Sequence, residues 1–339
     1  MTATYALDLA QVEAARRTIE GTAVLTPLVP SPCLSELAGQ AFLLKLEITQ
    51  PIGAFKLRGA VNAIFSLAGD VAGVTCCSTG NHGRGVAYAA RERGLRAVVC
   101  MSSLVPQTKV DGIRALGAEV RIVGTSQDDA YAESLRLVAE EGLVEISPFD
   151  DPAVIAGQGT IGLEIIEQAP DVDTILVPLS GGGLAGGIAF AVKQKNPGVR
   201  IIGITMDRGA AMHASLQAGH PVEVEEVASL ADSLGGGIGL DNRLTFALCR
   251  EYLDDVLLVS EEEIYRAMQT LYYEDALVCE GASAVGVAAL QAGKLPAPAG
   301  PVATVITGRN LDMRVHADIM QGHDVVLGNL TVKGRAYGT

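Results

Sequence analysis

Residues 74–147 repeat short apolar runs separated by longer amphipathic segments. The apolar runs have the length of buried strands and lie at 74–78, 97–101, 119–123 and 143–147. Between them, apolar residues recur at helical spacing over 82–93, 107–116 and 127–141. Strands that alternate with helices and are apolar on both faces are typical of a parallel sheet covered by helices. This part of the chain is therefore predicted to be a doubly wound α/β unit.

A second alternating block follows the break at Pro148-Phe149-Asp150-Asp151-Pro152. Its pattern predicts helices at 153–168, 184–195, 261–272 and 280–291, and strands at 174–179, 199–206 and 302–306. The N-terminal part predicts helices at 8–20, 31–37 and 55–67 and a strand at 41–47. We therefore expect two doubly wound parallel-sheet domains: a large one from residues 1–48 and 150–339, and a smaller one inserted at 49–149. The last twenty residues are only weakly patterned.

Composition narrows the possible functions. Apolar residues make up 49% of the chain, but no run reaches the roughly eighteen apolar residues of a membrane span. A formal net charge of -14 argues against nucleic acid and anionic membranes as partners. The six cysteines show no C-x-x-C spacing, and residues 1–5 show no signal-peptide pattern, so we expect reduced thiols and a cytoplasmic location.

Lys56 stands out within the glycine-hinged segment 52–60, where Phe55 and Leu57 flank it. Loss of hydration disfavours a charged ammonium, and the positive end of a helix beginning here would disfavour it further. A neutral, nucleophilic amine is what a Schiff-base lysine needs. The alternative is an ordinary exposed helix lysine whose stem packs on Phe55.

The run Ser180-Gly181-Gly182-Gly183-Leu184 follows an apolar strand and opens a helix. Closely approaching backbone N–H groups and the helix dipole suit a phosphate, and the lack of a following P-loop lysine argues against ATP. Gly181, Gly183 and Gly186 also spell G-x-G-x-x-G, with Asp207 after the next strand where a ribose-binding acid would stand. A nicotinamide cofactor, another phosphate ligand and simple close packing all remain open on this motif alone.

Three further positions carry candidate chemistry. The loop Ser78-Thr79-Gly80-Asn81-His82-Gly83 joins a strand to a helix and suits a carboxylate, although Ser and Thr are also ordinary helix caps. Thr307 lies at the carboxyl end of a strand, where α/β sheets bind ligands, although a simple strand-to-loop turn is the alternative. Glu280 opens a helix, which the helix dipole alone would explain.

Taken together, these motifs resemble the fold-type II pyridoxal-phosphate (PLP) enzymes, which are tryptophan synthase β-like in fold, and within them the threonine dehydratase and serine racemase group. The resemblance rests on the order of Ala-Phe-Lys-Leu-Arg-Gly, Ser-Thr-Gly-Asn-His-Gly, Ser-Gly-Gly-Gly-Leu and Cys-Glu-Gly-Ala. It implies that Lys56 binds pyridoxal 5'-phosphate covalently and that Thr307 meets the pyridine nitrogen. The other cofactor contacts that it implies are Phe55 on the ring, Asn81 on the ring hydroxyl, Glu280 near the ring and Ser180, Gly181, Gly182, Gly183 and Leu184 on the phosphate. It also implies that the substrate carboxylate is received by Ser78, Thr79, Asn81 and His82.

Several positions depart from the family pattern. Ala54 replaces a small hydroxyl residue, and Arg309 replaces a common glycine. Thr79, which with Lys56 forms the expected catalytic set, stands where racemases carry a serine that works as the second acid or base. Residues 205–211, where some relatives hold a divalent cation with several acids, offer the single carboxylate Asp207, so no metal is expected.

The resemblance implies a lyase that eliminates water from a 3-hydroxy amino acid and releases a 2-oxo acid and ammonia, with Lys56 removing the α-proton. Residues 205–245 are most similar to the dehydratase encoded with hydroxyectoine-utilisation enzymes. The rival hypotheses are an amino-acid racemase, a β-replacement enzyme and a non-enzymatic dinucleotide-binding module. The expected partners are a small amino-acid substrate and a second copy of the chain in a homodimer.

Overall fold

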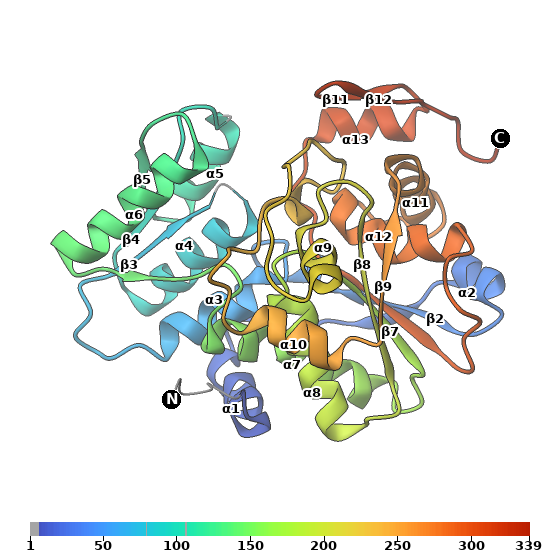
Figure 1. The fold of residues 1–339 in the computed structure, drawn as a ribbon, viewed down its shortest axis with the longest axis horizontal. Coiled ribbons are helices and arrows are strands. Elements are labelled where there is room, and N and C mark those ends of the chain that lie inside the picture. Colours follow the sequence, from blue (N-terminus) through green and yellow to red (C-terminus); the bar gives the residue numbers. More distant parts are fainter. Residues whose placement is uncertain (1–6, 79, 106) are drawn as a thin grey trace.

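The computed structural model describes residues 7–78, 80–105 and 107–339. Its helices pack around two main sheets, a six-stranded one, called the large sheet below, and a four-stranded one, called the small sheet (Figure 1). The six-stranded sheet has the order β1 (Leu28–Pro30), β2 (Phe42–Leu46), β10 (Val302–Ile306), β7 (Thr174–Pro178), β8 (Arg200–Met206) and β9 (Asp255–Val259). The four-stranded sheet has the order β5 (Glu119–Ile122), β4 (Ala97–Met101), β3 (Val74–Cys77) and β6 (Val144–Glu145). All these neighbours pair in parallel except β1 with β2.

The large sheet is buried between two helical layers. Ile175 and Val177 of β7 face a core that contains side chains of α7 (Pro152–Gln168), α8 (Gly183–Lys195), α9 (Ala211–Ala218) and α10 (Thr245–Tyr252). Leu176 faces the opposite core, formed with α2 (Pro32–Ala38), α11 (Glu261–Tyr273), α12 (Gly281–Gln291) and α13 (Met313–Met320). Alternation of side chains along a strand produces these two faces.

The small sheet is covered in the same way. One core combines it with α3 (Lys56–Phe65), α4 (Asn81–Arg93) and α5 (Gln107–Ala115), whereas Val98 and Cys100 face α6 (Gln127–Glu141). Helix α1 (Leu9–Ile19) packs against α7. The predicted fold class, two doubly wound parallel sheets, is confirmed. All strands of the small sheet lie within 49–149, and the domain boundaries themselves stay a prediction.

Strand register brings two of the predicted loops to the same edge of the large sheet. Ile306 lies opposite Leu46, so Thr307 directly follows the carboxyl end of the central strand β10. The neighbouring strand β7 runs parallel to β10 and leads into the glycine run at 180–184. Ligands bind at this edge of α/β sheets.

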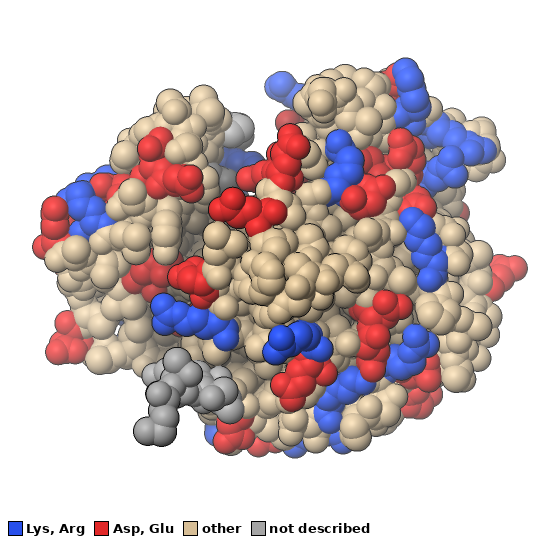
Figure 2. All heavy atoms as spheres, in the orientation of Figure 1, with Lys and Arg blue, Asp and Glu red and all other residues tan. Residues whose placement is uncertain are grey.

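The sequence pattern did not predict some short elements. They are β1, α9, α10, β9, α13, the β11 (Val325–Leu327) and β12 (Leu330–Val332) hairpin, and the 3-10 turns η1 (Glu47–Thr49) and η2 (Asp232–Leu234). Among the described helices, none combines the length and the apolarity needed to cross a bilayer. On the face drawn in Figure 2, Lys and Arg side chains are scattered among Asp and Glu rather than gathered in one basic patch.

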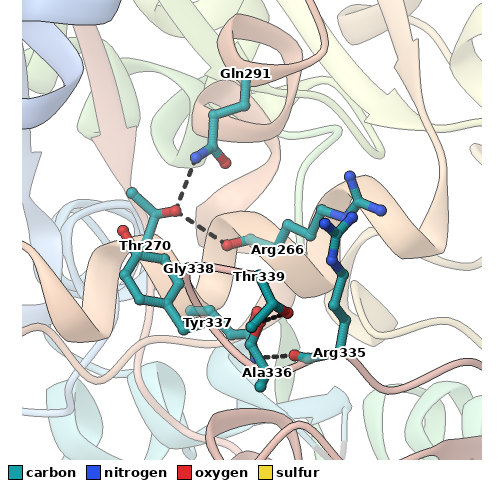
Figure 3. A pocket seen from close by; sticks show the side chains of 9 residues that line it. Arg266, Thr270, Gln291, Arg335, Ala336, Tyr337, Gly338 and Thr339 are labelled. Atoms are coloured by element: carbon teal, nitrogen blue, oxygen red, sulfur yellow. Dashed lines mark hydrogen bonds between the residues drawn. The ribbon is translucent and has the colours of Figure 1, made fainter.

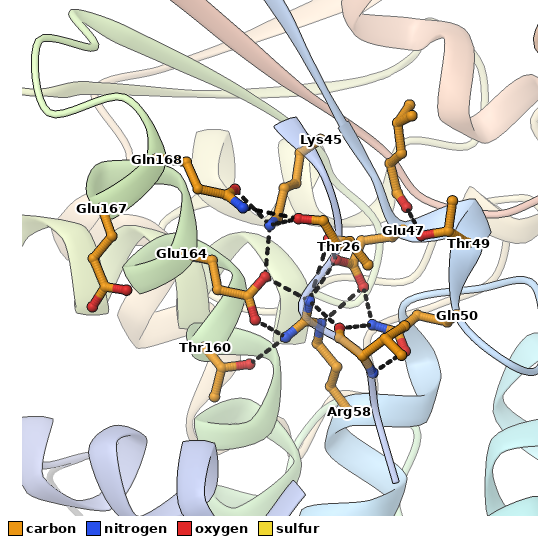
Figure 4. Close-up of polar contacts among 12 residues, drawn as sticks. Thr26, Lys45, Glu47, Thr49, Gln50, Arg58, Thr160, Glu164, Glu167 and Gln168 are labelled. Carbon is orange, nitrogen blue, oxygen red and sulfur yellow. Dashed lines mark hydrogen bonds and ion pairs between the residues drawn. The ribbon is translucent and has the colours of Figure 1, made fainter. Parts of the chain in front are cut away.

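A buried ionic cluster anchors α3 to the rest of the fold (Figure 4). Arg58, two residues after Lys56, is 1% exposed and donates to both oxygens of Glu47 at 2.8 Å and to both oxygens of Glu164 at 2.6 and 2.8 Å. Lys45 of β2 donates to Glu164 at 2.6 Å and to the carbonyl of Thr26 at 2.7 Å. The cluster therefore ties α3 to β2, η1 and α7.

Ionisation of the cluster follows from its pairing. Burial alone would raise the pKa of Glu47, but the Arg58 guanidinium, with further contributions from the Thr26 hydroxyl and Lys45, holds this pKa below its ordinary value. Burial lowers the pKa of Lys45 more than Glu164 raises it. Glu47 thus stays a carboxylate that depends on Arg58 for its charge compensation.

Candidate functional site

Lys56 is the first residue of α3, as the sequence predicts. Its amine donates to the carbonyl of Pro148 at 2.6 Å and lies 5.4 Å from the centre of the Phe55 ring. Burial lowers the pKa of Lys56 to about 8. The alternative of an ordinary exposed lysine is wrong, and an appreciable share of neutral amine is present near neutral pH.

The end of β10 lies directly beside the segment that delivers Lys56. Phe55 donates its backbone N–H to the carbonyl of Thr307 at 2.9 Å, and Ala54 forms an isolated antiparallel bridge with Gly308. Two segments far apart in sequence are thereby joined directly by backbone hydrogen bonds.

The glycine run forms the turn between β7 and α8. Gly182 has a φ of +88° and is the N-cap of α8 without a side-chain cap bond, so the first N–H groups of the helix are open to a ligand. A Cβ at Gly181 would lie 2.3 Å from the Phe149 ring, and one at Gly182 would lie 2.7 Å from Met212. Only glycines leave this turn its shape, which is that of an anion-binding loop.

Asp207, the candidate ribose-binding acid of a dinucleotide site, lies in surroundings that do not suit that role. The charges that act on the Asp207 carboxyl group belong to Arg208, Lys294 and Glu263, and burial raises the pKa of Asp207. Glu263 lies on α11, which covers the sheet face opposite α8. This arrangement does not support a ribose contact shared with the glycine run.

Among the described residues of the loop before α4, the Ser78 hydroxyl accepts from the N–H of Gly80 at 3.3 Å and not from an N–H of the helix, while the N-cap Gly80 has no side chain to cap it. The helix-cap alternative is therefore wrong for Ser78. Thr79 lies outside the described residues.

His82 is buried, and its Nε2 lies 2.7 Å from the carbonyl of Ile146. Because a carbonyl only accepts, Nε2 carries the proton of the neutral ring. Burial, with a further contribution from Lys56, lowers the pKa of His82 to about 3. His82 is neutral at physiological pH and lies close enough to Lys56 for the ammonium charge to lower its pKa.

Glu280 belongs to the same buried constellation. Asn81 donates to its two oxygens at 2.9 and 3.2 Å, and the Ser233 hydroxyl donates to Oε1 at 3.3 Å. Burial, aided by the Asp232 carboxylate, raises the pKa of Glu280 to about 7, although Asn81 and Ser233 oppose this. Glu280 is the N-cap of α12, where the helix dipole would lower the pKa of a carboxyl group, so the raised pKa is not explained by the dipole alone.

Thr307 is 2% exposed and presents a neutral hydroxyl at the end of β10. Its Oγ1 lies 3.0 Å from Oγ of Ser283, which also donates to the Gly308 carbonyl at 2.9 Å and accepts from the Gly308 N–H at 2.8 Å. These contacts join Thr307 to other uncharged groups rather than to a carboxylate.

The structure thus brings Lys56, Asn81, His82, Glu280 and Thr307 to one side of the large sheet, next to the glycine run. Sequence reasoning missed the partners that hold them, which are Pro148, Phe149, Ser233, Ser283 and Asn310. Gly308 offered one usable signal, because a Cβ there would lie 2.3 Å from Oε1 of Glu280. A glycine required after Thr307 indicates a close approach at this point.

Away from the candidate site, a hollow of about 230 Å³ lies between α11 and the C-terminal segment (Figure 3). Arg266 and Arg335 are among the residues that line this hollow, and Gln291 donates to Thr270 at 2.7 Å. None of the candidate site residues lines this hollow.

The described residues fit pyridoxal phosphate. A partly buried lysine with a lowered pKa would supply the covalent link, and a glycine turn that any Cβ would fill would hold the phosphate. Thr307 would meet the ring nitrogen as a neutral group. Within the described part of the chain, no cluster of three or more His, Cys, Asp or Glu is arranged to hold a metal ion.

Replacing Gly182 with Asp should abolish cofactor binding, because the new side chain would fill the turn, strain a residue at positive φ and place a negative charge beside the phosphate. Asp207→Ala is the matched control and should leave cofactor affinity unchanged. Equilibrium titration of the cofactor-free protein measures both. Mass spectrometry of denatured protein that released a dinucleotide would contradict the assignment.

Comparison with known proteins gives a consistent result. Residues 19–308 match the family described as pyridoxal-phosphate dependent enzyme. The chain is 56% identical over 318 residues to a Sinorhizobium fredii protein named "Putative threonine dehydratase", covering 93% of this chain and 96% of that one. It is 42% identical over 311 residues to an L-threonine ammonia-lyase of Thermotoga maritima, covering 91% and 77%. A solved structure of maize serine racemase superposes with a TM-score of 0.87 at 32% identity, covering 91% of this chain and 95% of that one.

Proposed function

This chain belongs to the family of pyridoxal-phosphate-dependent enzymes and is a lyase that uses this cofactor, and we propose that it eliminates water from a 3-hydroxy amino acid. The products would be a 2-oxo acid and ammonia. The observation that carries the proposal is the Lys56 amine, whose pKa burial lowers to about 8 beside the glycine run.

When bound, the cofactor supplies an electron sink that acidifies the α-proton of an amino acid. Because the pKa of Lys56 is lowered to about 8, a share of its amine is neutral near neutral pH and would accept this proton. The Ser78 hydroxyl and the backbone N–H groups of Asn81 and His82, at the start of α4, would receive the substrate carboxylate, because the one ring proton of His82 is donated to the Ile146 carbonyl. Thr79 belongs to the same loop in the sequence. Glu280, with a pKa of about 7, would hold or release a proton near the reacting atoms.

The neutral Thr307 favours elimination over other outcomes. Thr307 would place a hydroxyl at the ring nitrogen, and a hydroxyl does not stabilise the protonated form of that nitrogen as a carboxylate would, so the bound cofactor would be a weaker electron sink. Prompt loss of the β-hydroxyl is then the favoured path. Racemisation is the second candidate, since the fold resembles that of maize serine racemase, and Thr79 in place of the racemase serine weighs against it.

The specific substrate that we propose is 3-hydroxy-2,4-diaminobutyrate, a compound related to hydroxyectoine breakdown. The proposal is supported by the resemblance of residues 205–245 and by the acids near the site. Asp232 lies close enough to Glu280 to raise its pKa, and these carboxyl groups could meet a second amine. Arg309 is exposed at the rim, where its N–H donates to the Gly53 carbonyl at 3.0 Å.

Keto-acid and ammonia release should be compared as kcat/KM for 3-hydroxy-2,4-diaminobutyrate, threonine, serine and 3-hydroxyaspartate. We expect the diamino substrate to be preferred, because a satisfied polar contact can change specificity by up to about 10⁴-fold. A clear preference for threonine would refute the specialised substrate and leave the dehydratase. Inverted substrate recovered on chiral analysis, with no keto acid formed, would refute both.

We also propose that the enzyme acts in the cytoplasm as a homodimer on free amino acids. The cysteines support the cytoplasmic part of the proposal, since all six thiols are free in the structure. The homodimer is proposed on the family resemblance. Neither nucleic acid nor a membrane is proposed as a partner.

A further inference from the structure

The short segment that leaves β6 and enters α7 touches the site at several points. The carbonyls of Ile146 and Pro148 accept from His82 and Lys56 at 2.7 and 2.6 Å. The next residue, Phe149, packs so tightly on the glycine run that a Cβ at Gly181 would lie 2.3 Å from its ring. Phe149 therefore forms one wall of the turn.

Helix α10 forms the opposite wall. A Cβ at Gly182 would lie 3.0 Å from Cβ of Thr245 and 3.0 Å from the sulfur of Cys249. One turn further along α8, a Cβ at Gly186 would lie 3.0 Å from Cβ of Leu248. The glycine turn is thus clamped between Phe149 and α10.

Asp150 connects these two walls. Its Oδ2 accepts from the N–H of Arg243 at 2.8 Å, and its Oδ1 accepts from the N–H groups of Leu244 and Thr245, both at 2.9 Å. Helix α10 has no side-chain cap bond from its own N-cap residue, Leu244. Asn242 caps the helix locally, because its Oδ1 accepts from the N–H of Phe246 at 2.9 Å. A carboxylate more than ninety positions earlier in the chain accepts from the three N–H groups just before that of Phe246 and so adds a second, long-range cap.

We propose that Asp150 is a positioning residue that holds the phosphate-binding turn in its binding geometry by fixing α10 relative to Phe149. Asp150 need not touch the phosphate. It sets the separation of the two walls, and this separation determines where the N–H groups of the turn and of α8 point. The inference rests on the proposed assignment of the glycine run to the cofactor phosphate.

The test is the affinity of cofactor-free protein for pyridoxal phosphate and for pyridoxal, which can reach Lys56 but lacks the phosphate. Asp150→Ala should raise the Kd for pyridoxal phosphate about tenfold, which is the size of effect expected for a lost helix cap. The Kd for pyridoxal should stay within about twofold of the wild-type value. Asp150→Asn keeps one acceptor oxygen and should give an intermediate Kd.

Asp312→Ala is the matched control, because Asp312 caps α13 by accepting from the N–H of Arg314 at 2.8 Å and does not contact the glycine run. It should lower Tm without changing either Kd. An unchanged Kd for pyridoxal phosphate in Asp150→Ala, or in Asp150→Asn if the alanine variant does not fold, would overturn the proposal. So would an equal loss of affinity for both ligands, or an equal loss in Asp312→Ala. Normal cofactor binding by Gly182→Asp would instead show that the phosphate lies elsewhere.

Discussion

Lys56→Ala is expected to remove the covalent cofactor adduct and to lower kcat by at least about 10³-fold, the size of effect expected when a positioned proton acceptor is lost. The physical reason is that Lys56 supplies both the covalent link and the amine whose pKa burial lowers to about 8. Visible absorbance of the purified protein, before and after borohydride reduction, measures the adduct. Keto-acid formation measures turnover.

Lys195→Ala is the control for this experiment. Lys195 lies on α8 but is exposed and pairs with Glu13 at 2.7 Å, so its loss should leave both the adduct and turnover intact. Peptide mapping after borohydride reduction should find the pyridoxyl group on Lys56. A pyridoxyl group on any other lysine would disprove the assignment.

Arg58→Met should lower the free energy of unfolding by about 3–5 kcal/mol, because it leaves the buried carboxylates of Glu47 and Glu164 without their shared cation. Glu47 owes its lowered pKa to this guanidinium. Its stabilising contribution is therefore present above its unfolded-state pKa and is lost as the pH falls through the folded-state value. The urea midpoint of the cofactor-free protein near pH 7 measures the effect.

Helix α7 offers an exposed pair as a control. Arg16 donates to both oxygens of Glu167, at 2.5 and 2.7 Å, but the two side chains are 43% and 52% exposed. Arg16→Met should therefore cost less than about 1 kcal/mol. Equal losses in the two variants would mean that burial adds nothing to the Arg58 cluster.

The sequence predicts well those helices and strands whose own residues show a clear apolar spacing. The helix at 127–141 and the strands at 97–101 and 302–306 have the predicted bounds, because their apolar spacing and local caps are sufficient to define them. Helix α10 was missed because it is short and its start is held largely by the distant Asp150, which adds to the local cap from Asn242. Strand β9 was missed because it is a sheet-edge strand with only partial burial.

Some parts of the candidate site could likewise be predicted from the sequence and others could not. Lys56, the glycine run and Glu280 were found because their side chains, or the lack of one, have a recognisable chemistry. The groups that hold Lys56 and His82 are backbone carbonyls of Pro148 and Ile146. Any residue has a carbonyl, so sequence alone gives no sign of which one will accept the bond.

The strand order also sets the sequence of events during synthesis on the ribosome. The small sheet uses only strands between residues 74 and 145, so all its strands emerge before β7 is made. Strand β2, by contrast, pairs with β10, which begins at Val302. The nascent chain therefore exposes an unpaired apolar edge of β2 until almost the whole protein has been translated. Such an edge is prone to association with other chains, so slow translation of the later segments would prolong the period of greatest aggregation risk.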